Sequence, residues 1–374
     1  MRLKVQPGVI GVAIRPIITG ATRSLEEIMY DTAQQALLDA GLTIEDTDGI
    51  VCACNDQFDG RAISVMMASG PLGGVDRDIL STPSSSEHAF VLGALRVASG
   101  NYRTQLVVSW SPTEVSSMSE AQRLGTDPYF HRALPLDELS AHAMQAAALE
   151  HAVPGVRNLA LAVAAKNRGN GGAGALAAAG KLRWPLTPEM TTEPVTGAVA
   201  MVLATEDFIA ERGMGNVAWL RGMGWATEAA FLGDRKLATA PALEAAARQA
   251  YAAAGIDAGQ IDVAEVTDAT PYSELLAYEA LGLSPRAEWA TDIAAGRFGR
   301  DGAVPVNLSG GVLTANPVFC TGLIRIAEIA NQVRGKAGAH QRAGAKLGIA
   351  HAGSGPAMQY QAAVILGNEQ GTRA

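Results

Sequence analysis

An asparagine amide is the first group in this sequence that could act on a carbonyl. Asn316 lies in "NLSGGVLTANPVFCTG" (307–322), directly before Pro317, which biases it toward an extended conformation ahead of a predicted helix. Gly310 and Gly311 in the same stretch allow a tight backbone and the close approach of a ligand. The amide could donate to a carbonyl oxygen, and a turn with an asparagine cap fits the local pattern as well.

A histidine followed by a glycine-serine turn is the second candidate group. In "GIAHAGSGPAMQY" (348–360) an apolar strand is predicted to end at His351, and Gly353 and Ser354 lie in the turn that follows. The backbone amides of such a turn can bind an anion or an oxyanion. Imidazole is a usable general acid or base near neutral pH. A lone histidine can equally be a structural residue.

A tyrosine supplies the third candidate. In "EVTDATPYSELLAYEALGL" (265–283), Pro271 opens a predicted helix and Tyr272 lies in its first turn. Tyr272 could face a pocket as a proton donor, or it could be an aromatic residue of the core. All three stretches fall at predicted strand–helix junctions, where ligands of α/β proteins commonly bind.

A fourth stretch, "STPSSSEHAF" (81–90), offers serines at the start of a predicted helix. A serine hydroxyl such as that of Ser85 is a weak nucleophile and needs a positioned base, for which His88 and His351 are the candidates. The serines at 84–86 could instead cap the helix, because their side-chain oxygens can satisfy free backbone amides.

The composition narrows the class of protein. The chain has 374 residues, of which 48% are hydrophobic and 18% charged, with a net charge of −8. It contains no basic run of five or more residues, so we expect no nucleic-acid partner. Cys52 and Cys54 form C-x-C, and with Cys320 they leave no second ligand pair for zinc, so no metal is expected. The absence of a signal-peptide pattern and of a long apolar run predicts a cytoplasmic protein without a membrane span.

Two halves of the chain resemble each other. Residues 33–51 align without a gap to residues 247–265, and each segment reads as an Ala-rich helix, a Gly stop and a strand. Residues 89–111 and 322–355 repeat the same order more loosely. This self-similarity predicts a duplication rather than a chance likeness of Ala-rich helices.

The predicted halves define the domain organisation. We expect an N-terminal half over 1–210, with an insertion at about 113–190, and a C-terminal half over 211–374. Each half alternates strands and helices. The expected fold class is therefore α/β, with a mixed, largely parallel sheet covered by helices.

The chain resembles the thiolase superfamily, closest to its lipid-transfer-protein-type branch. Residues 307–322 resemble the signature N-x-x-G-G-x-x-x-x-G-H-P-x-G, and "HAGSG" (351–355) resembles the C-x-G-G-G loop. "TDATPYSELLAYEALGL" (267–283) and "VTGAVAMVLA" (195–204) resemble two further segments of that family. The resemblance implies the duplicated five-layer αβαβα thiolase fold, a homodimer, and an acyl-CoA or similar thioester substrate. Coenzyme A would then be part of the substrate, with no tightly bound cofactor.

The sequence departs from this family at its three catalytic positions. Asn316 stands where the activating histidine would be, His351 where the acid/base cysteine would be, and the serines at 84–86 lie where the nucleophilic cysteine would be. Cys320 is interpreted as a small buried residue rather than a displaced nucleophile. We therefore expect carbon–carbon bond chemistry on an acyl-CoA by an aldolase/lyase, or by an atypical acyltransferase, without a cysteine nucleophile.

This hypothesis assigns roles that depend on geometry. His351 would be the acid/base, Asn316 the oxyanion donor, and Tyr272 an auxiliary acid near the place of a tyrosine used by related aldolases. Asn316 and His351 must then converge on one carbonyl. The alternative is a non-catalytic acyl-CoA-binding or scaffold subunit. In either case the resemblance implies a possible small partner protein of the zinc-ribbon/OB-fold type.

Overall fold

The computed structural model describes residues 5–17, 23–60, 62–82, 85–112, 117–129, 131–134, 136–172 and 182–371. Its strands are β1 (Pro7–Ile17), β2 (Gly49–Ala53), β3 (Asp78–Thr82), β4 (Thr104–Ser111), β5 (Thr196–Thr205), β6 (Ala218–Thr227), β7 (Val263–Val266), β8 (Leu347–Ser354) and β9 (Tyr360–Gly367). Its longer helices are α1 (Leu25–Asp39), α4 (Ser86–Ala98), α6 (Glu138–Ala152), α7 (Val156–Gly171), α9 (Pro241–Ala254), α10 (Pro271–Ala280) and α12 (Thr321–Arg334). Its shorter helices are α2 (Asp56–Asp59), α3 (Ser64–Ser69), α5 (Met118–Leu124), α8 (Glu206–Glu211) and α11 (Trp289–Ala294).

The described strands form one continuous sheet in the order β3-β2-β4-β5-β1-β6-β9-β8-β7. Counted outward from the centre, β1-β5-β4-β2 and β6-β9-β8-β7 follow the same order of first, last, last but one and second strand, and β3 is an additional edge strand of the first half. This repeat of strand order confirms the predicted duplicated halves. Among the described strands, the parallel pairs are β2 with β3, β2 with β4, and β7 with β8. The sheet is therefore mixed as predicted but not largely parallel, because β5 and β9 each return antiparallel beside their neighbours.

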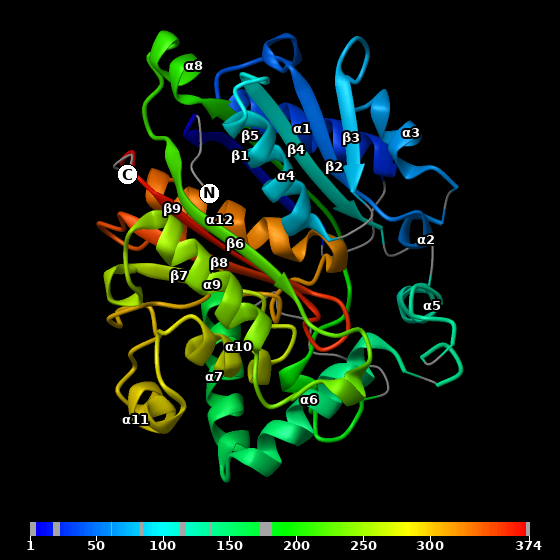
Figure 1. Cartoon of the computed structure of the whole chain (residues 1–374), viewed down its shortest axis with the longest axis vertical. Coiled ribbons are helices and arrows are strands. Elements are labelled where there is room, and N and C mark those ends of the chain that lie inside the picture. The colour runs from blue at the N-terminus through cyan, green and yellow to red at the C-terminus, as the bar shows by residue number, and fades with distance from the viewer. Residues whose placement is uncertain are drawn as a thin grey trace.

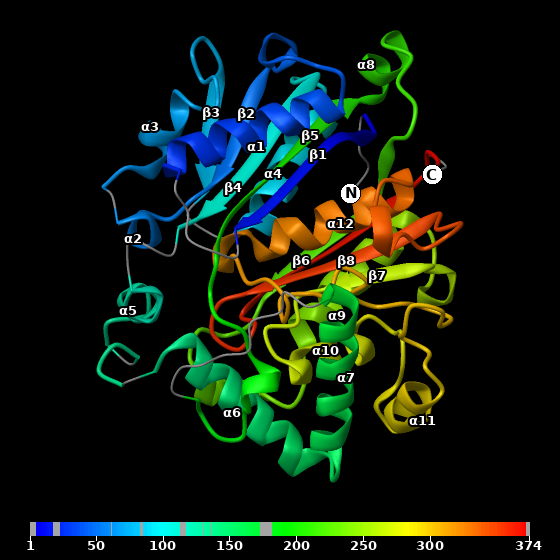
Figure 2. The ribbon, with the colours of Figure 1, turned by 180° about the vertical axis from the view of Figure 1, so that it is seen from behind.

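Helices cover both faces of each half and fill the space between the halves (Figures 1 and 2). α4 and α12 contact each other and pack between the two parts of the sheet, while α1 covers the outer face of the first half and α9 that of the second. Successive strand residues serve different layers. Leu106 of β4 packs in the cluster that contains Leu37 of α1, and Val107 packs with Phe90 of α4 and Leu323 of α12. These layers give the expected αβαβα arrangement.

The insertion between β4 and β5 belongs to the first half in sequence but packs on the second half. Leu149 of α6 and Val163 of α7 join the hydrophobic cluster of Leu275 on α10. Gln145 of α6 also donates to the carbonyl oxygen of Ala357, at 3.4 Å, in the turn after β8. The insertion thus lies beside the carboxyl end of β8, where the predicted glycine-serine turn begins.

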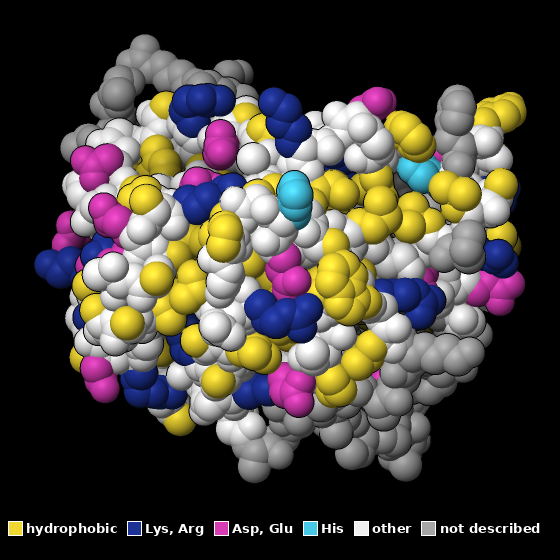
Figure 3. All heavy atoms as spheres, turned by 90° about the horizontal axis from the view of Figure 1, so that it is seen from below, with side chains coloured by type: hydrophobic (Ala, Val, Ile, Leu, Met, Phe, Trp, Pro, Cys, Tyr) yellow, Lys and Arg dark blue, Asp and Glu magenta, His cyan; other side chains and the backbone are white. Residues whose placement is uncertain are grey.

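The surface and the helices give two further observations. Seen from the end that carries α6, α7 and α11, basic and acidic side chains are interspersed with hydrophobic ones over the described surface (Figure 3). Among the described residues, every helix is too short or too polar to cross a lipid bilayer. The predicted absence of a membrane-spanning helix therefore holds for this part of the chain.

Candidate functional site

Two adjoining pockets lie between the insertion and the ends of β8 and α4. The first, of about 460 Å³, contains Ser85 in its lining and is called the Ser85 pocket. The second, of about 330 Å³, contains Asn316 and is called the Asn316 pocket. Their linings share Asp137, Glu138 and Ser354, so the two pockets meet along one wall. Together they form the candidate site.

Asn316 presents a free amide to its pocket. Its backbone carbonyl accepts a hydrogen bond from the amide of Val195 at 2.9 Å, which fixes the loop ahead of Pro317 against the strand region before β5. Its side chain lines the pocket and has no hydrogen bond to any other described residue. The amide is therefore available to donate to the carbonyl oxygen of a bound molecule.

A histidine of the insertion faces the same pocket. His142 of α6 is almost fully buried and lines the Asn316 pocket, with its Nε2 3.9 Å from Glu138 Oε1 one helical turn earlier. Its Nδ1 has no hydrogen-bond partner among the described residues. Reasoning from the sequence missed His142, because the insertion carried no motif that connected it to Asn316. The Glu138–His142 spacing was the one local signal.

Ser354 and Gly353 line the pocket as the last two residues of β8, which extends three residues beyond the strand end predicted at His351, so that the turn begins only at Gly355. Ser354 lies on the wall that the two pockets share, and its hydroxyl donates to Glu87 Oε1 at 2.7 Å. A Cβ added to Gly353 would come within 3.0 Å of His351 Nε2 and 2.7 Å of Met358 Sδ. A larger residue at this position would therefore have to displace the side chains of Met358 and His351 on that face of β8.

His351 lies on the other face of β8 from Ser354 and outside the Asn316 pocket. Ile349 packs in the same hydrophobic cluster as Leu275 of α10, whereas Ala350 packs in the cluster of Leu323 of α12. Because alternate residues of a strand share a face, His351 points to the same side as Ile349, toward α9 and α10. It is 1% exposed and lines a cavity of only about 10 Å³. Burial lowers the pKa of His351 to about 4, although the hydrogen bond with Gln361 at 2.7 Å opposes this. The structure does not bring Asn316 and His351 to one cavity.

Tyr272 is also placed away from the two pockets. Its ring is fully buried in the first turn of α10, and its hydroxyl donates to Glu150 of α6. Burial and the Glu150 hydrogen bond both raise the pKa of Tyr272. This position corresponds to the core-aromatic interpretation and not to a proton donor within the pockets.

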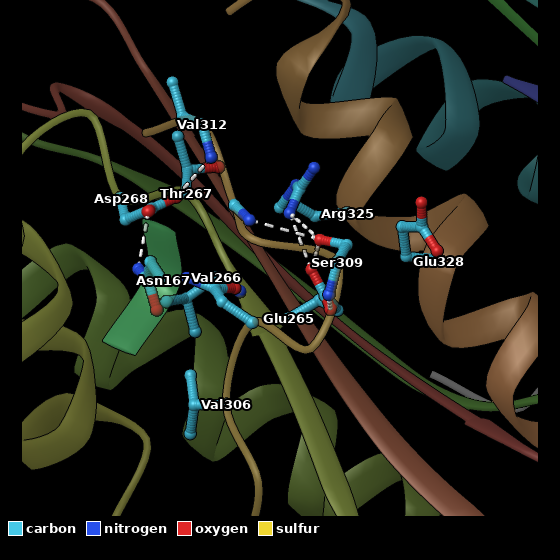
Figure 4. Close-up of polar contacts among 12 residues, drawn as sticks. Asn167, Glu265, Val266, Thr267, Asp268, Val306, Ser309, Val312, Arg325 and Glu328 are labelled. Carbon is cyan, nitrogen blue, oxygen red and sulfur yellow. Dashed lines mark hydrogen bonds and ion pairs between the residues drawn. The ribbon is translucent and has the colours of Figure 1, made fainter. Parts of the chain in front are cut away.

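Gly311 packs against a buried carboxyl and Gly310 against Gly171 and Thr314, and neither glycine lines one of the two pockets. Both have positive φ, 95° and 68°, and a Cβ on Gly311 would lie 2.3 Å from the carboxyl oxygens of Asp268. Asp268 accepts from the amide of Val312 at 2.6 Å and from Asn167 Nδ2 at 2.7 Å (Figure 4). Burial raises the pKa of Asp268 to about 7, and the neighbouring Glu274 adds to the rise. The tight backbone predicted from these glycines exists, but it encloses Asp268.

A second buried polar group holds the same loop (Figure 4). Arg325 of α12 contacts Glu265 Oε2 at 2.6 Å, and both side chains are buried. Ser309 donates through its amide and its hydroxyl to the two oxygens of Glu265, at 3.0 and 2.7 Å. Burial raises the pKa of Glu265, and the charge of Arg325 opposes that rise. Glu265 and Asp268 thus fix the chain that leads to Asn316.

The serines at the start of α4 have different surroundings. Ser85 lines the Ser85 pocket, and its side chain makes no capping hydrogen bond. Ser86 is buried, and its hydroxyl accepts from the amide of Leu323 at 2.9 Å, which ties α4 to α12. Residues 83 and 84, also candidates for the position of the nucleophile, lie outside the described residues.

The three cysteines are free thiols in the core. Cys52, Cys54 and Cys320 are all buried. Burial raises the pKa of each thiol, and for Cys54 the nearby Asp59 and Asp56 add to the rise. Cys320 is therefore a small buried residue, as predicted, and no cysteine lines either of the two pockets within the described residues.

Comparisons with known proteins bear on this arrangement. Residues 224–368 match the family described as thiolase C-terminal domain-like. Sterol carrier protein 2 from Homo sapiens is 41% identical over 107 residues, which are 28% of this chain and 20% of that protein. Acetyl-CoA acetyltransferase from Methanothermobacter thermautotrophicus is 33% identical over 157 residues, 41% of each. The chain thus matches less than half the length of either relative.

One solved structure shares the fold over the whole chain. The structure described as Ltp2-ChsH2(DUF35) aldolase superposes with a TM-score of 0.80, covering 98% of this chain and 98% of that chain. The two sequences are 19% identical, so the likeness concerns the fold. It agrees with the layered arrangement of helices and strands described above.

Proposed function

We propose that this chain, which belongs to the lipid-transfer-protein-type branch of the thiolase superfamily, is a lyase of the aldolase type. It would cleave, or in reverse form, the Cα–Cβ bond of a β-hydroxyacyl thioester without a cysteine nucleophile. The observation that carries this proposal is the Asn316 pocket, which is lined by both a free amide and the imidazole of His142 and by no cysteine of the described chain. An aldolase with the same fold supports the choice of reaction.

The reaction divides into two tasks that suit these two groups. When the Cα–Cβ bond breaks, negative charge develops on the thioester oxygen, and the Asn316 amide would stabilise it as a hydrogen-bond donor. His142 would exchange a proton with the α-carbon as a general acid or base. We assign these roles to Asn316 and His142. His351 does not replace His142 in this pair, because it is enclosed in a separate cavity of about 10 Å³.

The charges of the residues that line the two pockets indicate which part of the substrate binds there. Four carboxylates, from Asp127, Asp137, Glu138 and Glu193, line the two pockets, and no Lys or Arg of the described chain does. Such a lining disfavours phosphate groups. We infer that the pockets take the acyl group, the thioester and the uncharged pantetheine arm, while the phosphates of coenzyme A remain outside.

An acyl transfer reaction is the less favoured form of this proposal. It needs an activated nucleophile, and the described part of the chain offers Ser85 without a base hydrogen-bonded to its hydroxyl. The proposed assembly includes a homodimer, from family membership, and a small partner protein. The name of the similar aldolase structure describes two components, which supports such a partner.

The decisive experiment is an assay of the purified chain, with and without its partner, on panels of β-hydroxyacyl and β-ketoacyl thioesters. The thioesters carry coenzyme A in one set and N-acetylcysteamine in the other. Release of a free aldehyde or ketone is the expected result. Cleavage that requires added coenzyme A would show an acyltransferase instead, and saturable binding without product would show the scaffold subunit.

Two histidine variants test the assignment of the site. His142→Gln should lower kcat at least about 100-fold, the usual effect of losing a general acid or base. His351→Gln is the matched control, since it changes the same side chain in the buried cavity, and it should retain activity in the fraction that folds. A loss confined to His351→Gln would contradict the proposed site and restore the sequence-based one.

A further inference from the structure

A buried carboxyl of α4 is connected to the pocket wall through one hydroxyl. Glu87 is the second residue of α4, and its side chain is 0% exposed. Ser354 lines both pockets and donates to Glu87 Oε1 at 2.7 Å. The Ser354 hydroxyl therefore donates its proton to the Glu87 carboxyl, and the lone pairs of its oxygen can accept a hydrogen bond from a molecule in the pocket.

Among the described residues, no Lys or Arg contacts Glu87, in contrast to the buried Glu265 and Glu274. Glu265 contacts Arg325 at 2.6 Å and Glu274 contacts Lys166 at 2.9 Å. The imidazole of His88 lies beside Glu87, with its Nδ1 3.8 Å from Glu87 Oε1, and this nitrogen has no hydrogen bond of its own among the described residues.

The second oxygen of Glu87 is also left without a partner. Oε2 is buried and has no hydrogen bond to any described residue. It approaches Gly322 of α12 so closely that a Cβ there would lie 2.3 Å from it. A buried, partly satisfied carboxyl costs stability, so its presence beside a pocket calls for an explanation in function.

We propose that Glu87 and Ser354 form a proton relay that serves the Asn316 pocket. The relay rests on the proposed lyase reaction. It accounts for removal of the proton from the substrate β-hydroxyl, a step to which neither Asn316 nor His142 was assigned. Ser354 is the catalytic residue that touches the substrate, and Glu87 acts through it as the positioned base.

In the direction of cleavage, the relay removes one proton from the substrate. The β-hydroxyl of the substrate gives its proton to Ser354 Oγ while the serine proton passes to Glu87 Oε1. The electrons of the O–H bond form the new C=O bond, the Cα–Cβ bond breaks, and its electron pair becomes the enolate of the thioester. His142 then protonates the α-carbon. The proton then returns from Glu87 through the Ser354 hydroxyl and passes through pocket water to His142, which resets the site with no net gain or loss.

A purely structural role for Glu87 makes a different prediction. A carboxylate in the first turn interacts favourably with the amides at the start of a helix, and this role would affect only stability. Glu26 occupies the same second position in α1, away from the two pockets. Glu26→Gln is therefore the matched control for Glu87→Gln.

The test is the pH dependence of kcat in the wild type and three variants. Cleavage through the relay needs ionised Glu87, so the wild-type rate should rise with pH along an acid limb. Glu87→Gln should lower kcat at least about 100-fold and abolish that limb, with little change in KM. Glu26→Gln should leave both the rate and the limb unchanged.

Ser354→Ala supplies an independent check if Glu87→Gln fails to fold. Ser354 carries the proton between the substrate and Glu87, so its loss breaks the relay and should also lower kcat at least about 100-fold and abolish the acid limb. An unchanged acid limb in Glu87→Gln or in Ser354→Ala, with an active wild type, would overturn the relay alone. A wild type that cleaves no β-hydroxyacyl thioester would instead overturn the proposed function.

Discussion

Removal of the Arg325 guanidinium is the sharpest test of how the loop before Asn316 is held. In Arg325→Met, Glu265 loses the cation at 2.6 Å and keeps only the two hydrogen bonds from Ser309. Both Arg325 and Glu265 are almost completely buried, so water cannot replace the lost charge. Glu328 lies on the same helix as Arg325, and its charge already raises the pKa of Glu265. The variant therefore leaves an uncompensated buried carboxylate near a second acid.

The magnitude follows from the cost of breaking a buried ion pair from one side. That cost is about 3–5 kcal/mol, most of it from the charge left behind. Unfolding entropy is about 2.1 cal/mol/K per residue, or about 0.8 kcal/mol/K for 374 residues, so a loss of about 4 kcal/mol lowers Tm by about 5 °C. Because loss of the cation raises the pKa of Glu265 further, the destabilisation should grow as pH rises and the carboxyl ionises.

Urea and thermal unfolding at two pH values provide the measurement, with two comparisons. Arg297→Met removes a partly exposed arginine, with 38% of its side chain accessible, whose Nε lies 3.7 Å from Asp292, and should cost less than about 1 kcal/mol. Adding Glu265→Gln to Arg325→Met removes the stranded charge and should recover more than half of the loss. If Arg325→Met costs no more than Arg297→Met, or if the double variant recovers nothing, the reasoning about this ion pair is wrong.

Two further predictions concern the other buried groups. Asp268 has its pKa raised from 3.8 to about 7, so the folded state holds a proton that the unfolded chain releases between those values. The free energy of unfolding should therefore fall as pH rises from about 4 to about 7, and Asp268→Asn should flatten this slope in urea unfolding; an identical slope in the variant would contradict the shift. Because Cys52, Cys54 and Cys320 are buried with raised thiol pKa values, iodoacetamide should neither label the folded protein nor inhibit it. Rapid labelling that abolishes activity, measured by mass spectrometry and assay, would point to a cysteine nucleophile.

The sequence determined the fold class well because its signals are local or repeated. Helix–Gly–strand units at 33–51 and 247–265 predicted two similar halves, and the strand order of the described chain repeats in that way. The burial of Cys320 was predicted from the small residue that the family resemblance implies at its position, and the structure confirms it. The proportion of parallel pairs was wrong, because pairing direction depends on how β5 and β9 return through space and not on the periodicity of either strand.

The residues of the candidate site were also predicted only in part from the sequence. The sequence identified Asn316, Gly353 and Ser354 as residues near a pocket, and the structure places all three in its lining. It could not decide that His351, three residues before Ser354, faces the opposite side of β8, since a strand end carries no mark of which face is open.

Only the tertiary structure brought His142 and Glu87 to these positions. His142 comes from the insertion, which packs on the other half of the chain, and Glu87 comes from a helix enclosed between the halves. Local patterns report whether a residue belongs to a helix or a strand. Which side chains then meet at one pocket depends on the packing of distant layers, whose contacts span more than 100 positions of the chain.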